Sequence, residues 1–207
     1  MNDEQNGPQL YLITPVGATA STLGPLLSDV LDRFAVSCIR IPGAGTEDDL
    51  GRICDLVREI AHARDIPVVV EDHVQLAQRH GLDGVHLTKG ARKLRDIRKE
   101  LGADAIIGAF CGTSRHEGLN AGEAGADYVS FGPCGESSLN QGETVDPELL
   151  AWWSEMIEVP VVAEGALTPE LVVSLAPYTD FIAIGPEIWS ADDPAEALAL
   201  LWENVAP

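Results

Sequence analysis

Short apolar runs alternate with stretches of helical periodicity along the whole chain. Residues 68–87 carry this pattern in its smallest form. Val68–Val70 is a β-branched run, and Glu71-Asp72 follows at once. Apolar residues then recur over 73–80 as in a short helix, and Val85-His86-Leu87 is the next strand-like run. A strand, helix and strand within twenty residues predict a minimal βαβ unit, and such units build parallel sheets. The Glu71-Asp72 pair then ends its strand at the edge where α/β proteins place their chemistry.

The alternation continues from one end of the chain to the other. It predicts strands at residues 10–14, 36–41, 68–70, 85–87, 105–110, 128–131, 160–163 and 181–184. Helices are predicted at residues 19–34, 46–60, 73–80, 91–101, 114–124, 147–157, from 168 onward, and at 194–205. A phrase of helix exit, aspartate and buried strand recurs from Gly81, Gly125 and Pro177. Recurrence of one βα unit favours a closed α/β barrel, a single (β/α)8 TIM barrel over residues 1–207 with a polar arm at 1–8.

The charge of the chain narrows the classes of partner. It has 33 acidic and 13 basic residues, a formal charge of −20. This argues against nucleic acid and anionic membranes as partners, because both are bound through basic surface. It also works against long-range attraction of an anionic substrate. A solvated acidic face is the more ordinary explanation of the charge. The net charge does not decide whether the protein forms a homo-oligomer.

The location and redox state follow from two further features. No apolar run reaches the roughly eighteen residues of a membrane span, and the first ten residues are polar and acidic, unlike a signal peptide. The sequence therefore predicts a cytoplasmic protein. Its four cysteines, Cys38, Cys54, Cys111 and Cys134, have no metal-ligand spacing, so we expect reduced thiols.

Four strand motifs resemble one known family in order and in register. They are YLIT at residues 11–14, GLDGVHL at 81–87, GADYVSFGP at 125–133 and VPVVAEGA at 159–166. Together they make nearly the whole chain similar to the thiamine phosphate synthase family, which also contains thiazole tautomerases. The resemblance implies a transferase of thiamine biosynthesis that joins a pyrimidine diphosphate to a thiazole phosphate and releases diphosphate with the help of Mg²⁺. The implied partner is a phosphorylated small molecule.

The resemblance assigns roles to particular residues. Arg40 matches the family's arginine and would bind diphosphate, and Lys89, where a glutamine is usual, would supply a second cation. Asp72 matches the metal aspartate, with Glu71 in place of the usual asparagine, so both would hold Mg²⁺. Cys111 stands at the family's serine after the fifth strand. We therefore take Arg40, Lys89 and Cys111 as candidate catalytic residues.

The phosphate-binding turns match less closely. Candidate phosphate contacts are Ser137 after the sixth strand, Gly165 after the seventh and Gly185 after the eighth. Several family residues are replaced: Pro42 and Ala91 stand for a lysine and a metal aspartate, the lysine of the sixth turn is lost, Ala166 replaces a glycine, and Pro186 supplies no N–H donor. Four carboxylates are expected at the rim: Glu71, Glu136, Glu164 and Glu187. An unpaired carboxylate beside a shielded phosphate is unfavourable.

Each candidate also has a structural interpretation. Asp72 can cap the following helix, and Arg40 can form an ion pair with Glu71 or Asp72. Lys89 can be solvated, and His86 is more typical of a satisfied scaffold histidine. The remaining weaker candidates are His116 near the tautomerase histidine, Cys111 and Cys134 as a pair, and the consecutive Trp152 and Trp153, of which only one can face the core.

Three functional hypotheses remain. The first is a thiamine phosphate synthase. The second, from a different class, is a barrel that has lost catalysis and serves as a binding or regulatory protein, which the lost cations and acidic rim favour. The third, a thiazole tautomerase, lacks a well-placed histidine.

Overall fold

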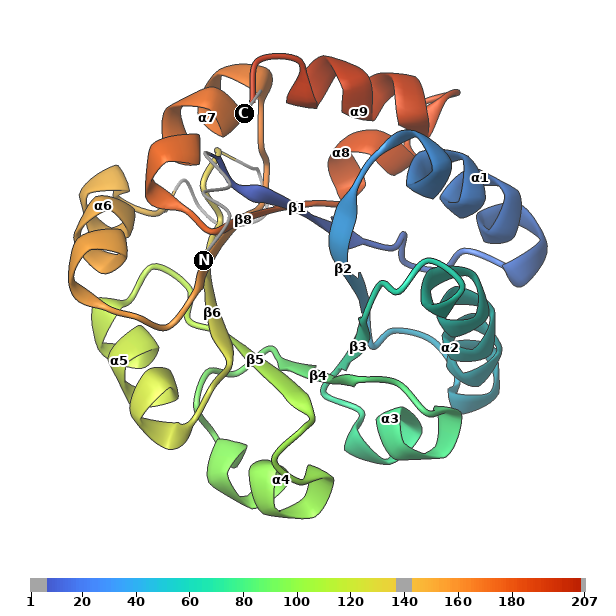
Figure 1. Cartoon of the computed structure of the whole chain (residues 1–207), viewed down its shortest axis with the longest axis horizontal. Coiled ribbons are helices and arrows are strands. Elements are labelled where there is room, and N and C mark those ends of the chain that lie inside the picture. The colour runs from blue at the N-terminus through green and yellow to red at the C-terminus, as the bar shows by residue number, and fades with distance from the viewer. Residues whose placement is uncertain (1–6, 137–142, 206–207) are drawn as a thin grey trace.

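The structure is a computed structural model that describes residues 7–136 and 143–205. Its parallel strands pair in sequence order, and the first strand pairs with the last, so the sheet closes into a barrel (Figure 1). The strands are β1 (Gln9–Ile13), β2 (Val36–Ile41), β3 (Val68–Glu71), β4 (Gly84–Leu87), β5 (Ile106–Phe110), β6 (Tyr128–Phe131), β7 (Val161–Glu164) and β8 (Phe181–Ile184). The predicted (β/α)8 barrel is confirmed.

Helices surround the barrel as an outer ring in Figure 1. They are α1 (Ala20–Arg33), α2 (Glu47–His62), α3 (Val74–His80), α4 (Leu94–Leu101), α5 (Arg115–Ala124), α6 (Pro147–Met156), α7 (Pro169–Leu175), the 3₁₀ turn η1 (Ala176–Tyr178), α8 (Pro186–Trp189) and α9 (Pro194–Trp202). Thr46 and Thr168 cap α2 and α7, because their side chains accept backbone N–H groups of the first turn.

The helices differ from the sequence expectation most clearly at α4 and α8. The helix predicted from residue 91 begins at Leu94, because Lys93 adopts a left-handed backbone conformation with φ of 64°. The last helical segment includes an extra short helix, α8, which the sequence pattern did not predict. That helix starts at Pro186, directly after β8, so it lies at the end of the barrel that receives the carboxyl ends of the strands.

The recurring aspartate of the sequence has a clear structural role. Asp83, which precedes β4, accepts the backbone N–H of Val68 at 2.7 Å. Asp127 does the same for Ile107 at 2.7 Å, and Asp180 for Val161 at 2.8 Å. Each side chain thus fastens the start of the preceding strand, and we call these three residues the aspartate clasps. All three lie at the N-terminal ends of the strands, away from the expected site.

The barrel interior changes character along its axis. Because side chains alternate across a strand, every second residue points inward. Toward the N-terminal ends, the interior holds an apolar cluster that includes Tyr11, Cys38 and Tyr128. Toward the C-terminal ends, it holds buried polar groups, among them Arg40 and His86. The fold therefore gathers its buried charge at the end where barrels of this kind bind their ligands.

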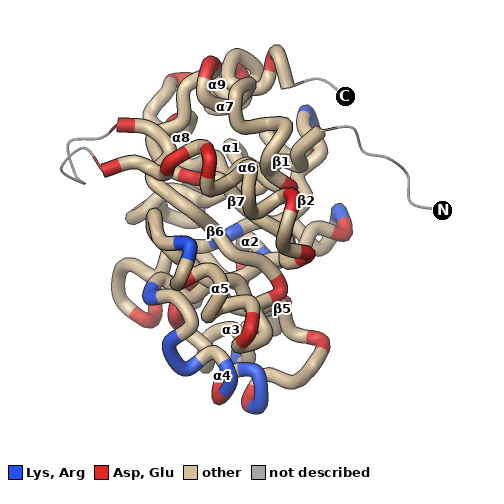
Figure 2. Tube along the Cα trace, turned by 90° about the vertical axis from the view of Figure 1, so that its left-hand side faces the viewer, with Lys and Arg blue, Asp and Glu red and all other residues tan. Residues whose placement is uncertain are grey.

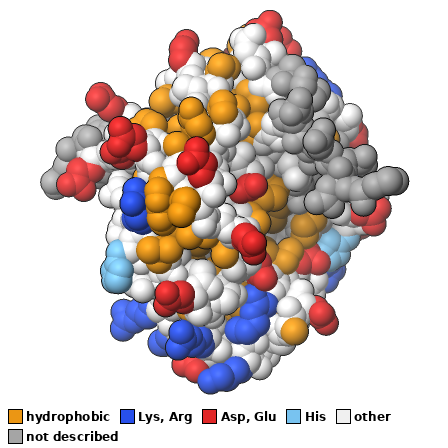
Figure 3. Space-filling model, turned by 60° about the vertical axis from the view of Figure 1, so that its left-hand side comes forward, with side chains coloured by type: hydrophobic (Ala, Val, Ile, Leu, Met, Phe, Trp, Pro, Cys, Tyr) orange, Lys and Arg blue, Asp and Glu red, His pale blue; other side chains and the backbone are white. Residues whose placement is uncertain are grey.

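The surface charge is uneven. Figure 2 shows the positions of Lys and Arg residues gathered around α4, while those of Asp and Glu are spread over much of the rest of the tube. Figure 3 shows the same basic group at one end of the molecule, with acidic side chains scattered over the face above it. Among the described residues, no helix is both long enough and apolar enough to cross a membrane.

Candidate functional site

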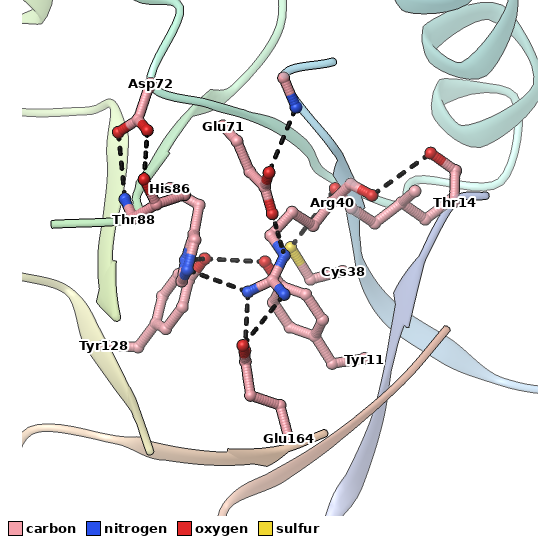
Figure 4. A network of polar contacts seen from close by, with 12 residues as sticks. Tyr11, Thr14, Cys38, Arg40, Glu71, Asp72, His86, Thr88, Tyr128 and Glu164 are labelled. Atoms are coloured by element: carbon pink, nitrogen blue, oxygen red, sulfur yellow. Dashed lines mark hydrogen bonds and ion pairs between the residues drawn. The ribbon is translucent and has the colours of Figure 1, made fainter. Parts of the chain in front are cut away.

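Arg40 lies at the centre of the polar interior, and its side chain is only 6% exposed. Its Nη1 and Nη2 atoms donate to the two carboxylate oxygens of Glu164 at 2.7 and 3.2 Å (Figure 4). Its Nε lies 3.1 Å from a carboxylate oxygen of Glu71, as an ion pair without hydrogen-bond alignment. The predicted ion pair between Arg40 and Glu71 is confirmed. Glu164, which Arg40 contacts in a bidentate manner, is a partner that the sequence did not suggest.

These contacts determine what Arg40 can do. One cation faces two partly buried carboxylates, so the group carries an excess of one negative charge when both are ionised. Burial raises the pKa of Glu71, and Arg40 together with the Gly43 N–H, which donates to Glu71 at 3.2 Å, offsets part of that shift. A phosphate that reached Arg40 would have to share the guanidinium with Glu164. The geometry therefore favours the structural interpretation, while the role of Arg40 in anion binding stays a prediction.

A chain of hydrogen bonds continues from Arg40 into the barrel. Arg40 Nη1 lies 2.9 Å from His86 Nε2, His86 Nδ1 lies 2.9 Å from the Tyr128 hydroxyl, and that hydroxyl lies 2.7 Å from the Tyr11 hydroxyl. Because arginine only donates, His86 Nε2 must accept, so Nδ1 carries the proton and donates to Tyr128. Tyr128 then donates to Tyr11. His86 is the satisfied scaffold histidine that the sequence favoured.

This hydrogen-bond network predicts how the stability of the fold responds to acid. Burial and the neighbouring Arg40 hold the pKa of His86 well below its ordinary range. Below about pH 6.5, His86 becomes protonated in the unfolded state but stays neutral in the folded state. The free energy of unfolding therefore falls, by up to about 1.4 kcal/mol per pH unit. Glu71, whose pKa is raised, acts in the opposite direction above about pH 4.5, because the folded state then holds the extra proton.

The His86 contribution can be isolated by difference. We expect denaturant unfolding of the wild type to lose more stability between pH 6.5 and 5 than that of His86→Gln, which cannot titrate in this range. Glu71 and the exposed histidines are present in both proteins, so their effects cancel. Parallel stability curves for the two proteins would contradict a neutral, buried His86.

Asp72 does not cap α3, so that structural alternative is wrong. The N-cap residue is His73, and its side chain makes no capping bond. Asp72 has a left-handed backbone with φ of 54°, and its carboxylate turns to the loop after β4 instead. There it accepts the Thr88 backbone N–H at 3.0 Å and the Thr88 hydroxyl (Figure 4). Glu71 points to Arg40, so the two adjacent carboxylates serve different partners.

The residues near Asp72 fit the expected Mg²⁺ only as a site that is shared with substrate. No group of three or more His, Cys, Asp or Glu side chains in the described part of the chain is arranged to hold a metal ion. Mg²⁺, however, usually keeps several waters and binds through one or two carboxylates together with substrate phosphates. Asp72 is exposed and, with oxygens that keep free lone pairs, fits such a shared site. Glu71 is already committed to Arg40 and Gly43.

The other candidate residues are placed as follows. Lys89 is exposed in the loop after β4, next to Thr88, on the same face as Asp72. Cys111 and Cys134 are buried free thiols, and burial raises the pKa of each to about 12, which works against a reactive thiolate. Ser137 lies outside the described residues.

The turns after β7 and β8 meet at a carboxylate. Glu187 accepts the Leu167 backbone N–H at 3.2 Å through one oxygen and the Gly185 N–H at 2.9 Å through the other. Gly165 and Ala166 both have positive φ, 89° and 52°, and turn the chain into this contact. The two candidate phosphate-binding turns are therefore brought together, with Glu187 between them, while their role in phosphate binding stays a prediction.

Several features of the site escaped sequence reasoning. Tyr11 and Tyr128 look like ordinary core aromatics, and nothing local signals their hydrogen bonds. Ser130, on β6, is fully buried and its hydroxyl has no hydrogen-bond partner among the described residues. Tyr128 and Ser130 are two residues apart on β6, so their side chains point to the same side of the strand. This alternation was the one signal that could have placed Ser130 inside the barrel.

Two of the weaker candidates lie outside the network. His116 is exposed on α5 and contacts the Asn120 side chain at 3.2 Å. Of the two tryptophans, Trp153 is fully buried, as expected of one, while Trp152 is partly exposed under the Arg115 guanidinium at 4.1 Å. Neither residue belongs to the polar interior.

The fold and the site define a (β/α)8-barrel protein whose polar groups gather at the C-terminal mouth. Comparison with known families is specific: the profile described as thiamine monophosphate synthase matches residues 10–187. The chain belongs to this family. The predicted family, and with it the predicted synthase-like class of protein, is confirmed.

Individual relatives agree with the family. A thiamine-phosphate synthase of Rhodospirillum centenum is 38% identical over 195 residues, which cover 92% of this chain and 94% of the relative. One of Erythrobacter litoralis is 36% identical over 198 residues, with 92% of both chains covered. Among solved structures, a thiamine phosphate pyrophosphorylase from Pyrococcus furiosus has a TM-score of 0.80, 23% identity and 95% coverage of both chains, which supports the fold.

Proposed function

We propose that this chain joins a pyrimidine diphosphate to a thiazole phosphate. In this reaction the bond between the pyrimidine methylene carbon and the diphosphate oxygen breaks, a bond from that carbon to the thiazole nitrogen forms, and diphosphate leaves with the electron pair. The observation that carries the proposal is the 38% identity to a thiamine-phosphate synthase across 92% of the chain. The polar C-terminal mouth is consistent with such a reaction.

The leaving diphosphate needs a cation that is free to approach it. We assign this role to Lys89, because its side chain is exposed while Arg40 is held by two carboxylates. A hollow of about 400 Å³ between the loops after β1 and β2 lies at the same end of the barrel and offers room for substrate; Thr14, Pro42 and Asp49 are among its lining residues.

Asp72 would hold Mg²⁺ jointly with the substrate. When bound, Mg²⁺ would neutralise part of the charge that develops on the diphosphate. Thr88 would keep the Asp72 carboxylate oriented, because it donates to both oxygens. Arg40 would act as a positioning residue that holds Glu71 and Glu164 away from the phosphate oxygens.

Arg40 and Glu187 also favour the second candidate, a barrel that binds without catalysing. Their donors and acceptors are already used within the protein. Four buried, free cysteines agree with a reducing compartment, for which we propose the cytoplasm.

The decisive experiment combines turnover with binding. Purified protein, Mg²⁺, pyrimidine diphosphate and thiazole phosphate are expected to release diphosphate and form the joined product, and both should fall at least about tenfold in Lys89→Ala and Asp72→Asn, a loss of about 1.4 kcal/mol in transition-state stabilisation. Lys93→Ala, which removes a neighbouring exposed lysine, serves as the charge-matched control. Calorimetric titration with diphosphate should give heat only when Mg²⁺ is present.

The outcomes separate the two candidates. Mg²⁺-dependent binding of diphosphate without turnover would favour the non-catalytic barrel. No turnover and no heat at millimolar diphosphate would exclude the synthase. The mouth of the barrel would then be expected to bind a ligand that carries no diphosphate.

A further inference from the structure

Glu187 supplies a carboxylate where two backbone N–H groups from separate turns converge. Leu167 belongs to the turn after β7 and Gly185 to the turn after β8. Each donates to a different oxygen of the same carboxylate, at 3.2 and 2.9 Å. Backbone N–H groups presented by the turns after strands 7 and 8 form the phosphate site of many (β/α)8 barrels. Here the anion that they hold is part of the chain.

The backbone around this carboxylate is fixed rather than adaptable. Ala166 adopts a positive φ of 52°, which costs a residue other than glycine roughly 1–2 kcal/mol. Gly185 packs tightly on β1, where a Cβ would come within 2.8 Å of the Ile13 Cβ. Gly135 approaches Ala166 so closely that a Cβ would come within 1.8 Å of the Ala166 carbonyl oxygen. The two N–H groups are therefore held in place from several sides.

Neighbouring residues of the mouth do not supply other groups for phosphate in place of the two N–H groups that Glu187 occupies. Glu164, at the end of β7, already binds the guanidinium of Arg40 through both oxygens. Pro186 has no N–H to offer between Gly185 and Glu187. An incoming phosphate would thus meet a carboxylate of the same charge sign on the donors it needs, with no buried free cation in the described part of the mouth to offset it.

We propose that Glu187 is an internal competitor for the phosphate of the thiazole substrate. A phosphorylated substrate must displace the carboxylate before it gains the Leu167 and Gly185 N–H groups, whereas the corresponding thiazole alcohol does not. Glu187 thereby narrows the preference of this chain for the phosphorylated substrate over the alcohol. The inference rests on the proposed function, because it concerns which thiazole the coupling reaction accepts.

The test compares two thiazoles and three proteins. The ratio of kcat/KM for thiazole phosphate to that for thiazole alcohol is measured in wild type, Glu187→Ala and Glu187→Gln. We expect the ratio to rise at least about tenfold in Glu187→Ala, corresponding to about 1.4 kcal/mol. Glu187→Gln should give a smaller rise, because its amide oxygen still accepts one N–H. The ratio does not depend on the fraction of active protein, so a loss of stability does not disturb it.

A charge-matched control separates local from general electrostatics. Glu170→Gln removes a fully exposed carboxylate at the start of α7, close to Leu167 in sequence but outside the Glu187 contacts. It should leave the ratio unchanged. A ratio that stays the same, or falls, in Glu187→Ala would overturn the proposal and leave Glu187 as a purely structural link between two turns.

Titration with inorganic phosphate tests the inference without turnover. Glu187→Ala should bind phosphate at least about tenfold more tightly than wild type and Glu170→Gln. If neither thiazole gives product in any protein, the proposed function fails, but this binding comparison still decides the role of Glu187. Equal phosphate affinity in all three proteins would reject it.

Discussion

Replacement of Arg40 by methionine is expected to lower the free energy of unfolding by about 3–5 kcal/mol. The change removes the only cation in contact with Glu71 and Glu164 among the described residues, and their side chains are just 20% and 13% exposed. Two carboxylates would then remain partly buried without a cation, and His86 would lose the donor to Nε2. Unfolding in denaturant, followed by circular dichroism, measures the loss.

The control is a surface arginine. Arg52 lies 3.7 Å from Asp49 with both side chains largely exposed, so Arg52→Met should cost no more than about 1 kcal/mol. Glu164→Gln in the Arg40→Met background should recover part of the lost stability, because it removes one unpaired charge. A loss in Arg40→Met as small as that in Arg52→Met would show that Arg40 is kept for a ligand rather than for the fold.

Replacement of Gly108 by alanine is expected to cost about 3 kcal/mol or more. A Cβ on Gly108 would lie 2.0 Å from Cζ and 2.3 Å from the hydroxyl oxygen of Tyr128, inside the packed barrel. Tyr128 would have to move, at an overpacking cost of about 1–3 kcal/mol, and its hydrogen bonds to His86 and Tyr11 would break at a similar cost. The melting temperature and the free energy of unfolding both report this effect.

A compensating substitution makes the cause specific. Tyr128→Leu should destabilise on its own, yet cost much less when Gly108 is already alanine, since the two changes share one space. Gly122→Ala is the matched control: its Cβ would lie 3.5 Å from Val159, and it sits in α5, where alanine is favoured over glycine by up to about 1 kcal/mol. Additive losses for Gly108→Ala and Tyr128→Leu would contradict a direct clash.

The strands and their order could be predicted because buried parallel strands appear as short apolar runs, with Val68–Val70 as the plainest case. The start of α4 could not be predicted. Lysine rarely adopts a left-handed backbone conformation, so nothing in the sequence indicates one at Lys93. The helix α8 was missed since only four residues, Pro186–Trp189, form it.

The candidate site was predicted in location but not in its contacts. Glu71 and Asp72 are adjacent in sequence, which suggested a shared ligand. Strand alternation instead directs Glu71 to Arg40, and the positive φ of Asp72 turns its carboxylate to Thr88. Glu164 is 124 residues from Arg40, and no local pattern joins them. Such a contact follows only once the barrel is closed and inward-pointing residues of β2 and β7 share its interior.

The aspartate clasps bear on how relatives of this chain are recognised. Asp83 and Asp127 lie within strand motifs that mark the family, Asp180 precedes β8, and all three bind the N-terminal ends of strands. Their contacts stabilise the barrel at the end opposite the mouth, so they do not depend on the reaction that takes place there. The contacts that hold the strands together and the residues that would meet a ligand therefore lie at opposite ends of the barrel.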